Sequence, residues 1–309
     1  MIPAFRFSGH ETFPCRYAWL PKAFLALNED PAGLANEEEA MVSLGVGKNM
    51  VRAIRFWVQV TGVAHPGEKG SYHITEFGRE LLSPQGHDPF LEDIRTLWLL
   101  HWKLSTRVED PLFAWDYLLN RWQRPEISRT EVLSAFQREA ERLDRNLSSV
   151  TLQQHFDTFL HTYVPTRGRK GDIQEDNLDC PLVELQLIEK IGERAHANGR
   201  MEDLYAFRRE RKQEITADLF LFCLQDFWNT RRRNEKTLTF RDVAVAHGSP
   251  GQILKLPELD LRERLESINR DSGGYFSYEE SASVQRLTRQ EFSGKDFLSG
   301  IFACRGRDA

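Results

Sequence analysis

The chain has 309 residues, of which 40% are hydrophobic and 28% are charged, a composition typical of folded globular proteins with room for two or three domains. Its 46 Asp and Glu residues outnumber its 41 Lys and Arg residues, so the net charge of -5 excludes a uniformly basic nucleic-acid coat protein. A local basic surface is still compatible with these totals.

No apolar run is long enough to cross a membrane, and the first residues lack the basic and then apolar pattern of a signal peptide. We therefore expect a soluble, cytoplasmic protein that does not contact a membrane. The cysteines lie far apart in the sequence and form no CxxC pair, which argues against a disulfide scaffold or a zinc ribbon. They are Cys15, Cys180, Cys223 and Cys304.

Leucine, glutamate, arginine and phenylalanine are frequent and recur with a helical period, which predicts a mainly α fold with short β-hairpins. Residues 7–15 show no clear period and are interpreted as an irregular arm. A helix is expected to follow, from Tyr17 or Trp19 to Leu27.

The next segment predicts a helix-turn-helix. Asn36 can cap a short helix whose first turn carries Glu37, Glu38 and Glu39, where the helix dipole favours acids. This helix should end at Gly45. A second helix is predicted over 48–61, a spacing that fits two helices joined by a tight glycine-containing turn.

Two short strands are predicted after this helix pair. Residues 63–65 and 71–74 flank the turn at 66–70, and Thr75 can cap a further helix that extends to Leu82. Helix, turn, helix and hairpin follow one another in the order of a winged helix.

Turn signals divide the rest of the chain. A second helix pair, followed by a basic segment at 165–172, suggests that another part of the chain could also be winged-helix-like. The resulting division is 1–88, an N-terminal arm and winged-helix domain; 89–126, a Trp-rich helical connector; 127–190, the second winged-helix-like candidate; and 191–309, a C-terminal helical domain.

The second helix of the first pair carries a cationic stripe. At 100° per residue, one narrow edge of the helix holds the side chains of Lys48, Arg52, Arg55 and Gln59, with Asn49 beside it, and the helix contains no acid. Arginine can form two hydrogen bonds to guanine, and lysine and asparagine can hold phosphates or contact base edges. The alternative is a solvated amphipathic helix, since surface helices often carry Lys and Arg.

Other basic residues extend the predicted DNA-binding surface. Lys69 lies at the tip of the predicted wing, where it can reach a phosphate, and the basic segment can contact a nucleic-acid backbone. The full set of predicted DNA-binding residues is Lys48, Asn49, Arg52, Arg55, Gln59, Lys69, Arg167, Arg169 and Lys170.

No catalytic, metal-binding or cofactor motif is predicted. His10 and Glu11 precede Cys15, but the second histidine of a metalloprotease helix is missing and Pro14 would break that helix, so a structural role for His10 is favoured. The glycines at 45–47 resemble a phosphate loop but lack its first glycine and its Ser or Thr. We therefore expect a non-enzymatic protein without a bound metal or cofactor.

Several motifs resemble those of the bacterial DUF4007 family. They are Phe7-Ser8-Gly9-His10-Glu11-Thr12-Phe13 followed by Arg16, Trp19 and Lys22; Leu44-Gly45-Val46-Gly47-Lys48-Asn49-Met50-Val51 with Trp57; Thr162-Tyr163 with Glu175-Asp176 and Cys180-Pro181-Leu182; and Ser249-Pro250-Gly251. The matches are spread over most of the chain. The resemblance implies an association with gene clusters for DNA phosphorothioation and related phage defence, which encode proteins similar to phosphoadenosine-phosphosulfate reductase.

Two functions follow from the residues and the resemblance together. The first is a DNA-binding accessory protein of a DNA-modification or phage-defence system, which contacts double-stranded DNA through the winged helix. The alternative is a scaffold or adaptor subunit that binds the sulfurtransferase-like enzyme, because winged helices also bind proteins. No heptad seam marks a dimer interface, so the sequence leaves the oligomeric state open.

Overall fold

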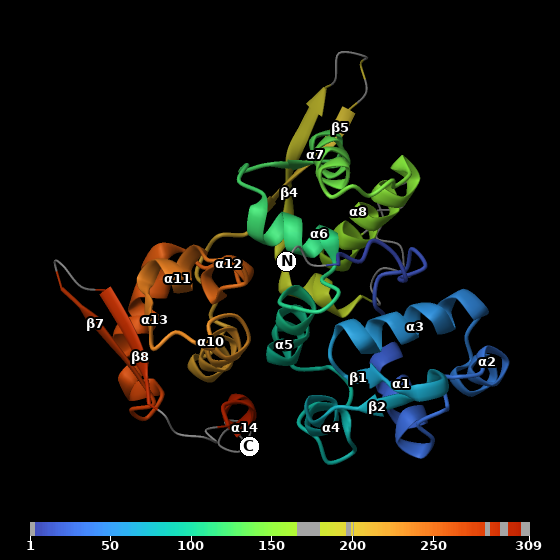
Figure 1. Cartoon of the computed structure of the whole chain (residues 1–309), viewed down its shortest axis with the longest axis horizontal. Coiled ribbons are helices and arrows are strands. Elements are labelled where there is room, and N and C mark those ends of the chain that lie inside the picture. The colour runs from blue at the N-terminus through green and yellow to red at the C-terminus, as the bar shows by residue number, and fades with distance from the viewer. Residues whose placement is uncertain are drawn as a thin grey trace. The chain divides into compact units, whose positions relative to one another are not determined.

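The computed structural model describes residues 4–165, 180–195, 199, 201–281, 285–290 and 296–303. The chain forms two compact units, which we call unit 1 (Met1–Trp115 and Gln123–Arg208) and unit 2 (Asp116–Trp122 and Arg209–Ala309). Helices dominate both units (Figure 1). Among the described residues, unit 1 contains two small antiparallel sheets and unit 2 contains one. The four-part division drawn from turn signals stays a prediction.

Unit 1 contains most of the helices. They are α1 (Trp19–Glu29), α2 (Glu37–Leu44), α3 (Lys48–Val60), α4 (Glu76–Leu82), α5 (Ile94–Ser105), α6 (Phe113–Asp116, which ends in unit 2), α7 (Arg129–Arg142) and α8 (Ser149–Tyr163), with 3-10 turns η1 (Glu68–Gly70) and η3 (Pro181–Leu185). The strands are β1 (Ala64–Pro66), β2 (Tyr72–Ile74), β3 (Ile127–Ser128), β4 (Ile188–Ala195) and β5 (Met201–Phe207).

Caps set the ends of the first helices where the sequence predicts them. The Asn36 side chain accepts a hydrogen bond from the Glu38 amide at 2.9 Å, and the Thr75 side chain accepts one from Gly78 at 2.9 Å. Gly45 ends α2 in the left-handed conformation with φ of 66°, which glycine adopts without steric cost. Local chemistry therefore determines where α2 ends and where α3 can begin.

Large aromatic side chains form the core of unit 1. The indoles of Trp57, Trp98, Trp102 and Trp115 are fully buried, and those of Trp57 and Trp115 meet edge to face with ring centroids 6.3 Å apart. Helix α3 contributes seven buried residues to this core. Such burial fixes the rotation of α3 about its axis, because only one edge of the helix is left to carry polar side chains.

Unit 2 is built around an apolar helix and a small sheet. Its elements are the π-helical turn η2 (Tyr117–Arg121), α10 (Ala217–Arg231), β6 (Thr237–Thr239), α11 (Phe240–Val245), α12 (Pro250–Ile253), α13 (Glu258–Asp271), β7 (Phe276–Glu280), β8 (Gln285–Arg289) and α14 (Leu298–Phe302). The ring of Trp228 stacks on that of Phe276 at 6.0 Å, which packs α10 against the sheet.

The same order of elements recurs along the described chain: helices, then an antiparallel hairpin. We call α2, α3, β1 and β2 the first module; β3, α7, α8, β4 and β5 the second; and β6, α11, α12, α13, β7 and β8 the third. In the second and third, the strand that precedes the helices pairs with the last strand, giving orders β3-β5-β4 and β6-β8-β7. In the first, the Pro31 carbonyl accepts a hydrogen bond from Tyr72 of β2 at 2.8 Å in the corresponding place.

The structure also contains strands that the sequence does not predict. They include the long hairpin of β4 and β5 and the strand β8. The predicted basic contacts Arg167, Arg169 and Lys170 lie outside the described residues. Within the described part, no helix has the length and apolar character needed to span a bilayer.

Candidate nucleic-acid interface

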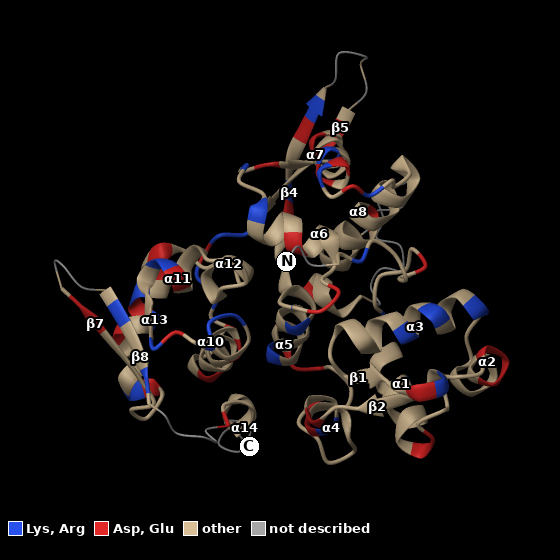
Figure 2. Cartoon of the chain, viewed as in Figure 1, with Lys and Arg blue, Asp and Glu red and all other residues tan. Residues whose placement is uncertain are grey.

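The first half of α3 carries the exposed part of the predicted cationic stripe. The side chains of Lys48 and Arg52 are 58% and 42% exposed, and Asn49 is exposed beside them at the start of the helix. The opposite faces of α3 are buried in the core. These three residues therefore form an outward edge, as the helical period predicts. Figure 2 shows that α3 carries Lys and Arg positions and no Asp or Glu.

One carboxylate from the preceding helix contacts the stripe. Glu37, the first residue of α2, lies 3.1 Å from Lys48 Nζ, 2.7 Å from Arg52 Nε and 3.7 Å from the Arg55 guanidinium. Its hydrogen bonds with Arg52 and Lys48 lower the pKa of Glu37 to about 2, so it is ionised at neutral pH. Three cations face one carboxylate here, and the stripe keeps a net positive charge.

Arg55 and Gln59 lie on the predicted stripe but form hydrogen bonds within the protein, whereas the sequence predicts that the whole stripe faces solvent. Arg55 Nε and Nη2 donate to the carbonyl oxygens of Leu34 and Ala35 at 2.6 and 3.0 Å, which secures the turn before α2. The Gln59 side chain accepts a hydrogen bond from Arg6 at 3.0 Å. A helical wheel considers α3 alone and therefore does not include these partners.

Lys69, which the sequence predicts at the tip of a wing, lies in the connection between two short strands. Lys69 is exposed in η1, the short connection between β1 and β2, and adopts a left-handed φ of 53°. The amides of Gly67 and Ser71 close this connection by hydrogen bonds to the Ser71 and Glu68 carbonyls at 2.8 and 3.0 Å. The tip is therefore a tight turn with the ammonium group at its surface.

A buried histidine pair connects the N-terminal arm to α8. The Ala114 amide donates to His155 Nε2 at 3.0 Å, and His155 Nδ1 lies 3.2 Å from His10 Nε2. The Thr12 amide donates to His10 Nδ1 at 3.1 Å. His10 Nδ1 lies 3.1 Å from the Thr158 hydroxyl, and its ring meets that of Phe56 edge to face. Burial, and then the charge of Arg6, lower the pKa of His10 to about 4. The structural role expected for His10 is confirmed.

The arm also fixes α3 directly. The indole Nε1 of Trp57 donates to the Phe13 carbonyl at 3.0 Å, and the Arg6 guanidinium lies 4.6 Å from the ring centroid of Phe56. Gly9 has a φ of 109°, which residues with a side chain rarely adopt, and a Cβ atom there would also displace the Arg6 guanidinium, 2.7 Å away. The motif at 7–13 is therefore part of the support of α3.

The helices equivalent to α3 in the other modules carry acids. In the second module Asp157 of α8 forms an ion pair with Arg129 at 2.5 Å. In the third, α13 contains Glu258, Asp260, Glu263, Glu266 and Asp271. Of the three helices, α3 is the one without an acid of its own.

A comparison with protein families gives the affiliation of the chain. The model of the family described as "Protein of unknown function (DUF4007)" matches residues 7–301, nearly the whole chain. The chain belongs to the DUF4007 family. The motifs at 7–13 and 44–51, which hold or form part of α3, are among those that carry the resemblance to this family.

Two solved structures are similar to this DUF4007 chain. One, described as the magnesium ion-bound SspB crystal structure, has a TM-score of 0.78 and 25% sequence identity. The other, described as the SspB crystal structure, has a TM-score of 0.76 and 24% identity. Each alignment covers 91% of this chain and 82% of the other. No curated protein matches the sequence.

The surroundings of Cys15 and of the motif Ser249-Pro250-Gly251 indicate structural roles. Burial raises the pKa of the Cys15 thiol well above its ordinary value, which disfavours the reactive thiolate. Ser249 caps α12 in the motif Ser249-Pro250-Gly251, and the adjacent His247 lies 2.6 Å from the buried carboxylate of Asp116. Among the described residues, no three His, Cys, Asp or Glu side chains come together as metal ligands.

Sequence reasoning missed one member of the interface. Glu37 was interpreted as a helix-dipole acid, but its carboxylate also organises the cations of α3. No local sequence pattern reveals this contact, because it depends on how α2 packs against α3.

Proposed function

We propose that this DUF4007 protein is a non-enzymatic accessory protein of a phosphorothioation-type DNA-modification or phage-defence system, and that it binds duplex DNA with its first module acting as a winged helix. The observation that carries the proposal is the acid-free helix α3, with Lys48, Asn49 and Arg52 exposed in its first half. The N-terminal residues of a recognition helix are those that contact base edges in the major groove.

Each exposed residue has a role in this complex. Arg52 is the candidate for a bidentate contact with guanine, and Asn49 for a contact with adenine. Lys48 and Lys69 neutralise phosphates on the DNA backbone, and these contacts supply most of the affinity. Arg55 and Gln59 hold the helix in place instead, since their polar groups already have partners in the protein.

The family supports the biological setting. The family resemblance implies gene clusters that encode a protein similar to phosphoadenosine-phosphosulfate reductase, and we propose this protein as a partner of the chain. An accessory protein that holds DNA would bring the substrate to such an enzyme. The proposal assigns no catalytic residue, metal or cofactor to this chain.

Duplex binding measured against salt concentration tests the proposal. We expect Lys48→Ala with Arg52→Ala to weaken binding of a DNA duplex about 10- to 100-fold and to reduce the slope of log K against log salt by about 2. Arg262→Ala with Arg270→Ala, on the equivalent helix α13, removes the same charge and serves as the matched control. Plain and phosphorothioated duplexes are compared in parallel.

Unchanged affinity in the α3 variant would contradict the proposal. Absence of DNA binding by the wild type, together with co-purification of the reductase-like protein, would favour the scaffold function instead. Equal losses in the α3 and α13 variants would indicate that net charge, and not α3, determines binding.

A further inference from the structure

Two exposed histidines lie side by side on the hairpin of the first module, and the proposed DNA contact does not use them. His65 of β1 and His73 of β2 are directly opposite each other in the antiparallel register. Opposite residues of a β-ladder point to the same face, and here the two imidazole rings have centroids 5.4 Å apart, with their planes at 48°. Because both residues are exposed, a ligand in solution can reach them.

The backbone of the hairpin fixes this pairing. The Gly67 amide donates to the Ser71 carbonyl at 2.8 Å on one side of the histidines. On the other side, the Thr75 amide donates to the Val63 carbonyl at 3.0 Å. Gly67 also leaves room for the ring of His73, since a Cβ atom at this position would lie 2.5 Å from His73 Nε2. The two imidazoles are therefore neighbours without any ligand to hold them together.

The separation of the two rings suits a shared metal ion. Neutral imidazole is a preferred ligand of divalent transition metals such as Zn²⁺, Cu²⁺ and Ni²⁺. Two imidazoles that bind one tetrahedral zinc ion through bonds of about 2.1 Å have ring centroids roughly 5 Å apart. The 5.4 Å between His65 and His73 is close to this value, so a small rotation of the side chains is enough to close the chelate.

The backbone contact of His65 leaves one of its ring nitrogens available. Nδ1 lies 3.5 Å from the Pro66 carbonyl oxygen, which can only accept a hydrogen bond. A proton on Nδ1 satisfies this contact, and Nε2 then carries the lone pair that a metal ion needs. Metal-binding histidines commonly donate their other ring N–H to a backbone carbonyl in this way.

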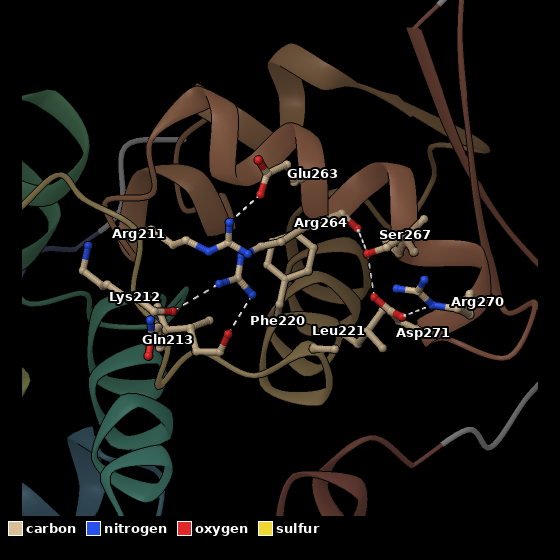
Figure 3. Close-up of a pocket in the computed structure, with 13 residues that line it drawn as sticks. Arg211, Lys212, Gln213, Phe220, Leu221, Glu263, Arg264, Ser267, Arg270 and Asp271 are labelled. Atoms are coloured by element: carbon tan, nitrogen blue, oxygen red, sulfur yellow. Dashed lines mark hydrogen bonds and ion pairs between the residues drawn. The ribbon is translucent and has the colours of Figure 1, made fainter.

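The charged side chains around the cavity of unit 2 differ from these imidazoles, because they pair within the protein. This cavity, of about 540 Å³, lies between the segment before α10, the first turns of α10, and α13 (Figure 3). Arg211 pairs with Glu263 at 2.6 Å, and Arg264 donates to two carbonyl oxygens, as Figure 3 shows. A ligand there would have to replace these contacts, whereas a metal ion on the exposed hairpin displaces water.

We propose that His65 and His73 chelate one divalent transition metal ion of the zinc, copper and nickel class. Among the described residues, no third His, Cys, Asp or Glu side chain completes the site, so water fills the other coordination positions and the ion exchanges with solution. The ion links β1 to β2, each only three residues long, and so stabilises the hairpin whose connection carries Lys69. This inference does not rest on the proposed function and is tested without DNA.

Isothermal titration of the metal-free full chain with zinc, without a polyhistidine tag, tests the site. We expect His65→Gln and His73→Gln each to weaken zinc binding at least about tenfold, because a single imidazole lacks the second, intramolecular ligand. The double variant should bind zinc little more weakly than either single variant, since the two ligands act as a unit. His87→Gln, in unit 1 but outside the hairpin, is the matched control and should bind zinc like the wild type.

Hydrogen exchange gives a second readout that reports on the hairpin itself. Zinc should slow exchange of the amides of β1 and β2 in the wild type and in His87→Gln, but not in His73→Gln, because an ion that binds the folded hairpin opposes its opening. Magnesium should not replace zinc in this experiment, since Mg²⁺ prefers oxygen ligands.

Three results would overturn the assignment. They are the absence of zinc binding by the wild type at submillimolar concentration, equal zinc affinity of His65→Gln, His73→Gln and His87→Gln, and displacement of zinc by an equal concentration of magnesium. Circular dichroism shows whether the variants keep the fold, which is expected because the side chains of His65 and His73 are exposed.

Discussion

The first and third modules share an order of elements but distribute their charges differently. Helix α3 carries Lys48, Arg52 and Arg55 and no acid, whereas α13 carries three arginines and five acids. Each arginine of α13 pairs with an acid of its own helix: Arg262 with Glu258, Arg264 with Asp260 and Arg270 with Asp271.

The two helices carry equal numbers of basic residues. Under the proposed function, the location of their counter-ions therefore distinguishes the DNA-binding helix from the other. The acids of α13 belong to the same helix as its arginines, so they stay close to them whether or not a ligand is bound. The carboxylate that faces α3 comes from the neighbouring helix α2, and three cations share it.

The largest effect is expected from charge reversal on the two helices. Arg52→Glu should weaken duplex binding about 100- to 1000-fold, because it removes a phosphate or base contact and adds repulsion at the same place. Arg270→Glu makes the same change at an exposed arginine of α13, and we expect it to alter affinity less than about twofold. Fluorescence anisotropy with a labelled duplex compares the two.

Similar losses in both variants would remove the distinction between the modules. The reverse order, with the α13 variant more impaired, would transfer the DNA contact to unit 2. Thermal melts of both proteins show whether the fold is retained, which is expected because both side chains are exposed.

Helices α3 and α13 also differ in the contacts that stabilise them, and this difference predicts a different dependence of their stability on pH. Phe56 of α3 packs on the buried, neutral His10, whereas ion pairs surround α13. The folded-state pKa of His10 is lowered to about 4 from the ordinary 6.5, so the unfolded state binds more protons between these values. The contribution of neutral His10 to the free energy of unfolding is therefore complete above pH 6.5. It is lost as pH falls towards 4, and the free energy of unfolding decreases by about 2 kcal/mol between pH 7 and pH 5.

Hydrogen exchange with mass spectrometry resolves this effect by unit. After correction for intrinsic rates, amides of α3 and α8 should lose protection at pH 5, while those of α10 and α13 serve as an internal reference. His10→Gln cannot titrate and should show a smaller pH dependence. Equal protection of α3 at pH 5 and pH 7 in the wild type would contradict the neutral histidine pair.

Much of the first module was predictable because its signals are local. Asn36, Gly45 and Thr75 cap or end helices through contacts with residues at most a few positions away, and the structure confirms their roles. The hairpin of β4 and β5 was not predictable in the same way. Most of β4 is exposed, so its residues lack the alternation of apolar and polar side chains that reveals a half-buried strand.

The candidate interface was predictable in its first half only. The helical period correctly identifies the outward edge of α3, but it does not include partners from other segments. Arg55 meets carbonyl oxygens about 20 positions earlier, and Gln59 meets Arg6, 53 positions earlier. Contacts of this kind depend on tertiary packing. The hydrogen bonds of His10 with the body of the unit agree with the structural role expected for it, which rested on Pro14 excluding a metalloprotease helix.

The smallest and most diagnostic effect is expected at the carboxylate that distinguishes the two modules. Glu37→Gln removes the counter-ion shared by Lys48 and Arg52, and should therefore strengthen duplex binding about 3- to 10-fold while making the salt dependence steeper by about one ion. Glu263→Gln on α13 is the matched control and should leave duplex binding unchanged. If Glu37→Gln instead weakens binding to one base sequence and not to others, Glu37 contacts a base directly, since a carboxylate can accept a hydrogen bond from cytosine. A loss that is equal for all sequences would mean that Glu37 positions Arg52 for the DNA, and that the cations of α3 bind more weakly without their organising carboxylate.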